Sequence, residues 1–179
     1  MIILNLVGRK ARIWIGEMPF ASCNVDRSIE SFIEASAPSF KELRCAAVEL
    51  IEHRGGRILY GLLGAELRPN ASENLHLQIN ISSTVGAPFV DSIDSSKGKV
   101  FIGLPQQYAD GVLAGVLTVK DQLNTICVGD LLFNCAAYHD DASTQAFFSY
   151  LSNIVVRILS SDEWVPSKHE IAALFQEKF

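Results

Sequence analysis

The spacing of apolar residues changes several times along the chain, and each change predicts a different element. Residues 4–7 and 11–17 alternate apolar and polar side chains on either side of a Gly8-Arg9-Lys10 turn, which predicts an opening β-hairpin. Beyond Val25 the apolar positions recur every three or four residues, as they do in a helix with one buried face. This spacing predicts a first helix that ends near Pro38.

A second helix is predicted after this proline. Ser39 is a favourable N-cap, and apolar side chains follow it at helical spacing: Phe40, Leu43, Ala47, Leu50 and Ile51. Gly55-Gly56 would end this helix. Residues 57–67 are then expected to form a strand, and the turn residues within 68–73 indicate a boundary between two halves of the chain.

The second half of the chain has a clearer pattern. Residues 75–81 alternate apolar and polar positions without a break, which predicts a strand with one buried face. Further strands are expected at residues 89–93, 100–104 and 126–137, and residues 95–99 are expected to form an exposed turn.

Two helices with strong apolar faces are predicted in this half. Pro105 begins the first, whose buried face would carry Tyr108, Val112, Val116 and Val119. Gly111 and Gly115 lie beside that face. Because glycine costs about 1 kcal/mol relative to alanine inside a helix, we expect these two to pack closely against a sheet. The second helix is marked by apolar residues at helical spacing, namely Phe147, Leu151, Ile154 and Ile158.

A final helix is predicted over residues 167–179, where Ser167 and Glu170 form a capping box. Strands mixed with helices, without strict alternation, favour an α+β fold in which a mixed sheet is backed by helices. The pattern divides the chain into residues 1–71, with a hairpin, two helices and a strand, and residues 72–179.

The composition is that of a compact folded protein. Of the 179 residues, 49% are hydrophobic, and 20 acidic against 15 basic side chains give a net charge of -5. This composition excludes a disordered chain and a protein that binds nucleic acid by bulk positive charge. The first residues do not have the pattern of a signal peptide, and no apolar stretch approaches the ~18 residues of a membrane span, so a cytoplasmic location is expected. The four cysteines lack zinc-ligand spacing and are expected to be core thiols.

Candidate chemistry is confined to one short sequence. Tyr138-His139-Asp140-Asp141 places an imidazole beside two carboxylates between a strand and a helix, where a general base or metal ligand could lie. Adjacent side chains diverge, so a metal would need further ligands, and the aspartates are also explained as an anionic helix start. Nucleotide-binding, hydrolase and protease signatures are absent from the sequence. No catalytic residue, metal or cofactor is therefore assigned.

Two sequence blocks carry a family resemblance. Residues 99–108 combine a strand with a Pro-x-x-Tyr sequence before a glycine-containing helix, and residues 137–147 combine a Tyr-His pair with a helix start and an Ala-Phe pair. In order and spacing these blocks resemble domain IV of translation elongation factor G over residues 74–160. The resemblance implies the ribosomal protein S5 domain 2-like fold, which has a left-handed crossover. It would place His139 in the loop that enters the ribosomal decoding region.

These observations predict a non-enzymatic recognition protein. The first hypothesis is a stand-alone module that resembles elongation factor G domain IV and binds a macromolecular partner, which could be ribosomal, through Tyr138, His139, Asp140 and Asp141. A translocase is excluded because the chain has no P-loop. The second hypothesis is a small acidic immunity or inhibitor protein that neutralises a basic toxin domain. The third is an enzyme with a cleft between the halves, around His139 and Asp141. A membrane partner is not expected, nucleic acid would be contacted only indirectly or weakly, and the oligomeric state stays open.

Overall fold

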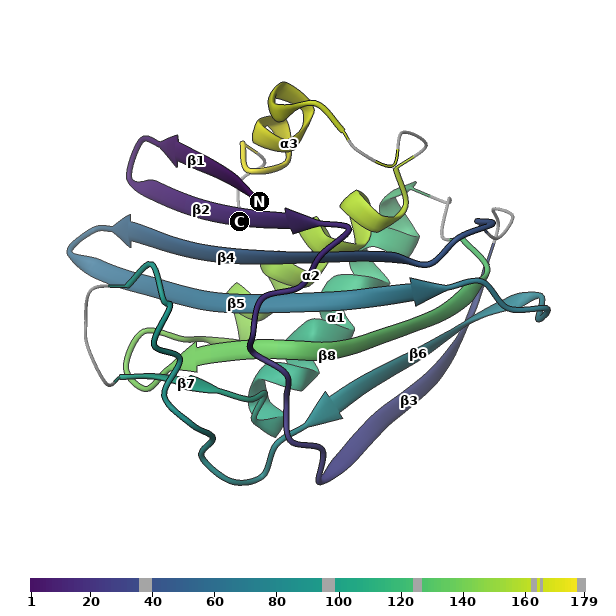
Figure 1. Ribbon diagram of the computed structural model, residues 1–179, viewed down its shortest axis with the longest axis horizontal. Coiled ribbons are helices and arrows are strands. Elements are labelled where there is room, and N and C mark those ends of the chain that lie inside the picture. Colours follow the sequence, from purple (N-terminus) through teal and green to yellow (C-terminus); the bar gives the residue numbers. More distant parts are fainter. Residues whose placement is uncertain (36–39, 95–98, 124–126, 162–163, 165, 177–179) are drawn as a thin grey trace.

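The fold is built on one mixed sheet backed by helices, which confirms the predicted α+β class (Figure 1). The computed structural model describes residues 1–179 except 36–39, 95–98, 124–126, 162–163, 165 and 177–179. Over this part of the chain the strands are β1 (Ile2–Leu6), β2 (Arg9–Ile15), β3 (Arg27–Glu34), β4 (Arg44–Arg54), β5 (Arg57–Arg68), β6 (Asn74–Ile81), β7 (Val100–Ile102) and β8 (Gly129–His139). The helices are α1 (Gln106–Leu123), α2 (Gln145–Leu159) and α3 (Lys168–Leu174).

The strands lie in the order β1-β2-β4-β5-β8-β6-β3, and β7 pairs with one end of β8. The opening hairpin is confirmed, since β1 and β2 pair antiparallel around Gly8. The strands predicted within residues 57–67 and 75–81 are confirmed as β5 and β6. Because β8 lies between β5 and β6, strands from residues 1–71 and from residues 72–179 share this sheet.

Both helices predicted in the first half are wrong, because the structure has strands there. Residues 27–34 form β3, which pairs antiparallel with β6, and residues 44–54 form β4, between β2 and β5. All side chains from Ala46 to Glu52 are buried, since β4 is covered on both faces, so the alternation that normally reveals a strand is lost. Gly55-Gly56 make the tight turn of the β4–β5 hairpin, both at positive φ. The predicted boundary residues Pro38 and Ser39 lie outside the described residues.

Residues 89–93 are also not a strand, contrary to the prediction. The Phe89 amide donates to the carbonyl of Val100 and the chain then turns, so only a single bridge, between Pro88 and Phe101, joins this segment to β7. The turn predicted at residues 95–99 falls mostly outside the described residues. The strand predicted to end at residue 137 continues to His139, where β7 still pairs with it.

Helices α1 and α2 pack against each other on one face of the sheet (Figure 1). The predicted apolar faces of both helices are confirmed, since all of their named members are buried. Gly111 and Gly115, however, face α2 and not the sheet. A Cβ at Gly111 would overlap the Gln145 carbonyl, and one at Gly115 would overlap groups of Ser149 and Ser152. The two glycines therefore let the helices approach closely.

The connection from β6 to β8 has an unusual hand. The two strands are adjacent and parallel, and the chain between them passes through β7 and α1. In Figure 1 both strands run towards the left, β8 lies above β6 and α1 lies behind the sheet, so the connection turns in the left-handed sense. Crossovers between parallel strands are right-handed in about 98% of cases. This hand is therefore a distinctive feature of the fold.

The face of the sheet opposite to the helices is only partly covered. Residues 16–26 cross it from β2 to β3 (Figure 1), where the Cys23 amide donates to the Asn134 carbonyl. Phe89 packs there in a second core cluster with Trp14 and Tyr60. On this face Glu30, Phe32 and Glu34 of β3 are exposed, whereas His76 and Gln78 of the neighbouring β6 are half-buried.

The C-terminal helix begins as predicted, because Ser167 and Glu170 form the capping box, but α3 ends at Leu174 and residues 177–179 are outside the described part. Arg9 ties this end to the sheet by donating to the Phe175 carbonyl and pairing with Glu52. None of the helices in the described ranges is long and apolar enough to cross a membrane.

Candidate functional site

The four candidate residues lie where β8 ends and the chain turns into α2. Tyr138 and His139 are the last two residues of β8 and are only 7% and 5% exposed, whereas Asp140 and Asp141 are exposed in the turn. The predicted loop is thus shorter than expected, because pairing of β7 with β8 extends to His139. We call residues 140–143 the β8–α2 turn.

The imidazole of His139 holds this turn together. Its Nδ1 accepts hydrogen bonds from the backbone amides of Asp141, at 3.0 Å, and Ala142, at 3.2 Å. Because Nδ1 acts as an acceptor, we assign the ring proton to Nε2, which faces Asp94 Oδ2 at 3.6 Å. Both ring nitrogens are therefore directed at protein groups. This arrangement favours a structural role for His139 over that of a general base, which needs a nitrogen open to substrate.

Further bonds fix the turn to the sheet and to α2. The Ser143 hydroxyl accepts from the His139 amide at 2.9 Å and donates to the Tyr60 carbonyl at 2.8 Å. The Tyr60 amide donates to the carbonyl of Ala142. Thr144 then caps α2 by accepting from the amide of Phe147. The turn is thus held in one conformation from both ends.

Tyr138 joins the two sequence blocks that carry the family resemblance. Its ring lies 6.1 Å from that of Phe101 and 5.7 Å from that of Tyr108, and Tyr108 stacks on Phe148 at 4.9 Å. Burial raises the pKa of the Tyr138 hydroxyl, as do the nearby Asp140 and Tyr108. Tyr138 is therefore a packing residue beneath the turn.

An open hollow of about 530 Å³ lies beside the turn. Its walls come from the β4–β5 hairpin turn, from Asp94 and Lys99, and from His139 and the residues after it. At its rim the Lys99 ammonium donates to Asp141 at 3.0 Å, and this hydrogen bond and the positive charge lower the pKa of the Asp141 carboxyl. Both partners are largely exposed. In the described part of the chain no three His, Cys, Asp or Glu side chains are placed to hold a metal ion.

A buried ionic cluster near this hollow was missed by the sequence reasoning. Glu49 of β4 is fully buried, and its carboxylate accepts from Arg12 Nε at 2.6 Å, Tyr60 Oη at 2.7 Å and the Ile93 amide at 2.9 Å. Arg12 also pairs with Asp91. Burial and the adjacent Glu49 raise the pKa of Tyr60. The one available signal was a glutamate inside an apolar run, Ala47-Val48-Glu49-Leu50.

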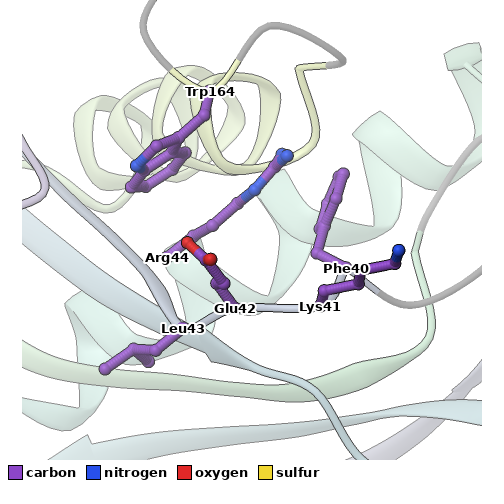
Figure 2. A pocket seen from close by; sticks show the side chains of 6 residues that line it. All are labelled: Phe40, Lys41, Glu42, Leu43, Arg44 and Trp164. Carbon is purple, nitrogen blue, oxygen red and sulfur yellow. The ribbon is translucent and has the colours of Figure 1, made fainter.

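A second, smaller hollow of about 170 Å³ lies at the start of β4, and Figure 2 shows Arg44 between Phe40 and Trp164 there. The guanidinium lies over both rings, with its carbon 5.1 Å from the centroid of the Trp164 ring. Its Nη1 donates to the carbonyls of Leu159, at 3.0 Å, and Ser161, at 2.7 Å. Arg44 therefore occupies the position that a ligand cation would take, and it fastens the end of α2 to the sheet.

No protein-family model matches the chain, and no curated protein matches it at a significant level. Any functional proposal therefore depends on the sequence itself and on the geometry of the turn and of the sheet.

Proposed function

We propose that this chain is a non-enzymatic recognition module that resembles domain IV of elongation factor G, and that the β8–α2 turn contacts a macromolecular partner. The observation that carries the proposal is the packing of Tyr108 between Tyr138 and Phe148, which joins the two blocks that resemble that domain. The left-handed connection through α1 also supports it, because the resemblance implies this uncommon hand.

The bonding of His139 supports recognition over catalysis. A recognition loop gains affinity when its bound conformation exists beforehand, because little conformational freedom is then lost on binding. The two amides on Nδ1 and the bonds of Ser143 supply such a fixed conformation. In this conformation the side chains of Asp140 and Asp141 are exposed to solvent.

The charge of the turn indicates the chemistry of the partner. The two exposed aspartates carry two negative charges against the one positive charge of Lys99, which pairs with Asp141. On a chain of net charge -5 the turn would therefore be repelled by nucleic acid phosphates and attracted by a basic protein surface. The partner that the resemblance suggests is the ribosome, and the contact would then be made with a basic ribosomal protein and not with bare RNA.

The test is co-sedimentation with ribosomal subunits purified from the native host, at low and then at raised salt. We expect the unaltered chain to sediment with one subunit and to be released by salt, since exposed charge pairs are screened. The double variant Asp140→Lys, Asp141→Lys should lose the interaction. Glu42→Lys with Glu73→Lys makes the same charge change at other exposed positions and serves as the matched control. No sedimentation of the unaltered chain, or an equal loss in both double variants, would overturn the proposal.

A second candidate function is an acidic inhibitor of a basic toxin domain. It is favoured by the exposed carboxylates that extend over a second surface, including Glu30 and Glu34 of β3. If this candidate is right, a toxin encoded beside the gene should form a one-to-one complex with the chain and lose its toxicity on co-expression. Unchanged toxicity would count against it.

A further inference from the structure

Strand β3 is the outermost strand on one side of the sheet (Figure 1). It pairs along its whole length with β6, from Arg27 opposite Ile81 to Glu34 opposite Asn74. Over the described ranges, no strand pairs with its other edge. An unpaired strand edge offers backbone donors and acceptors to another extended chain.

The side chains of β3 alternate between two different surfaces. Ile33 is buried in the core on the helix side of the sheet, and Ile29 packs against this core. Glu30, Phe32 and Glu34 lie on the opposite, open face, and all three are exposed. Phe32 is 73% exposed, which is unusual for an aromatic residue on a sheet.

One face of the Phe32 ring is covered by a neighbour on β6. The rings of Phe32 and His76 are stacked, with centroids 4.8 Å apart and an angle of 17° between their planes. His76 Nδ1 lies 3.4 Å from the carboxylate of Asp130 on β8. The rest of the Phe32 ring is exposed to solvent. Glu30 and Glu34 are the next residues on either side of Phe32 along the same face of β3.

We propose that the outer edge of β3 binds an extended, arginine-rich segment of a protein partner as an additional strand of the sheet. In such a segment every second side chain lies on the open face. An arginine there would stack on the exposed part of Phe32 and pair with Glu30 or Glu34. The intervening apolar side chains would extend the layer formed by Ile29 and Ile33. The inference rests on the proposed recognition role and assigns it a second surface.

The same charges argue against two other occupants. A second copy of the chain, paired along this edge, would bring the glutamates of both copies to one face, and like charges on facing strands are destabilising. A nucleic acid strand would be repelled by these carboxylates. A basic polypeptide is the occupant for which backbone pairing, ring stacking and charge all agree.

The test uses a synthetic peptide of alternating arginine and valine, eight residues long with blocked ends, titrated into the full chain at low salt. A peptide in which proline replaces valine keeps the charge but cannot pair as a strand, and serves as the control ligand. We expect saturable one-to-one binding of the first peptide only, with increased amide protection in residues 27–34. The affinity should fall about tenfold or more in Glu30→Lys with Glu34→Lys, and several-fold in Phe32→Ala.

Glu17→Lys with Asp110→Lys makes the same charge change at exposed positions outside β3 and the β8–α2 turn, and should alter peptide affinity by less than about twofold. All substituted side chains are exposed, so we expect each variant to fold, which a thermal unfolding profile checks. Equal weakening by both double variants, equal binding of the proline peptide, or no saturable binding would overturn the inference. The ribosome experiment tests the variants of the β8–α2 turn, and the peptide experiment tests the variants of β3. Each proposal can therefore be refuted without the other.

Discussion

The guanidinium of Arg12 and the carboxylate of Glu49 form a buried ion pair beneath residues 91–93, with Nε 2.6 Å from Oε2. Glu49 is fully buried, and Arg12 is 9% exposed. The pair joins adjacent strands, because Arg12 lies opposite Glu49 in the β2–β4 register. Through the Ile93 amide it also holds the segment that leads to Asp94 and the hollow beside the turn.

Replacing Glu49 by alanine should lower the free energy of unfolding by about 3–5 kcal/mol. The buried Arg12 Nε and the Tyr60 hydroxyl lose their acceptor, and Arg12 keeps only its contacts with the exposed Asp91. Urea unfolding measures this change. The control is Asp91→Asn, which removes the exposed partner of Arg12 and should cost less than about 1 kcal/mol. A Glu49→Ala loss as small as that of the control would show that the pair is not important for stability.

Gly115→Ala should destabilise the fold by about 1–3 kcal/mol, although alanine is the better helix former, because the added methyl group would overlap the Ser149 carbonyl and the Ser152 hydroxyl. The measurement is again urea unfolding. Ala114→Gly, at an exposed position one residue earlier on α1, should cost about 1 kcal/mol through helix propensity alone. Stabilisation by Gly115→Ala would mean that α1 and α2 are not in close contact there.

The clearest sequence patterns come from elements with one buried face. Residues 75–81 alternate because β6 has a core side and an open side, and α2 shows its period because only part of its surface is buried. β4 has no such contrast, since it is buried on both faces. In β3, Ile29, Phe32 and Ile33 match helical spacing by coincidence, although Phe32 points away from the core that contains Ile33.

The position of the candidate site could be predicted from the sequence, but the hydrogen bonds of His139 could not. A His-Asp-Asp sequence marks a polar turn, whereas the burial of His139 depends on pairing with β7, which lies far from it along the chain. The Glu49 cluster is equally non-local. Its partners Arg12 and Ile93 are 37 and 44 residues away, and no short motif connects them.

His139→Ala should destabilise the β8–α2 turn, because the amides of Asp141 and Ala142 lose their shared acceptor. We expect a loss of about 1–3 kcal/mol in the free energy of unfolding and faster hydrogen exchange at these two amides. His139→Asn keeps an acceptor close to the position of Nδ1 and should restore much of the amide protection. If alanine and asparagine behaved alike, the acceptor role of the ring would be refuted.

The stability of the fold should depend on pH through Glu66 of β5. Burial would raise the pKa of its carboxyl, but hydrogen bonds from Arg68 and Asn134 and the charge of Arg68 outweigh burial and lower it. A folded-state pKa below the unfolded value of about 4.3 means that Glu66 adds stability above that pH. This contribution is lost as the pH falls through the folded-state pKa.

Urea unfolding of the unaltered chain and of Glu66→Gln should therefore show a difference in the free energy of unfolding that is constant above about pH 6 and shrinks in acid. Parallel profiles down to pH 3 would show that the ionised form of Glu66 is not favoured by folding.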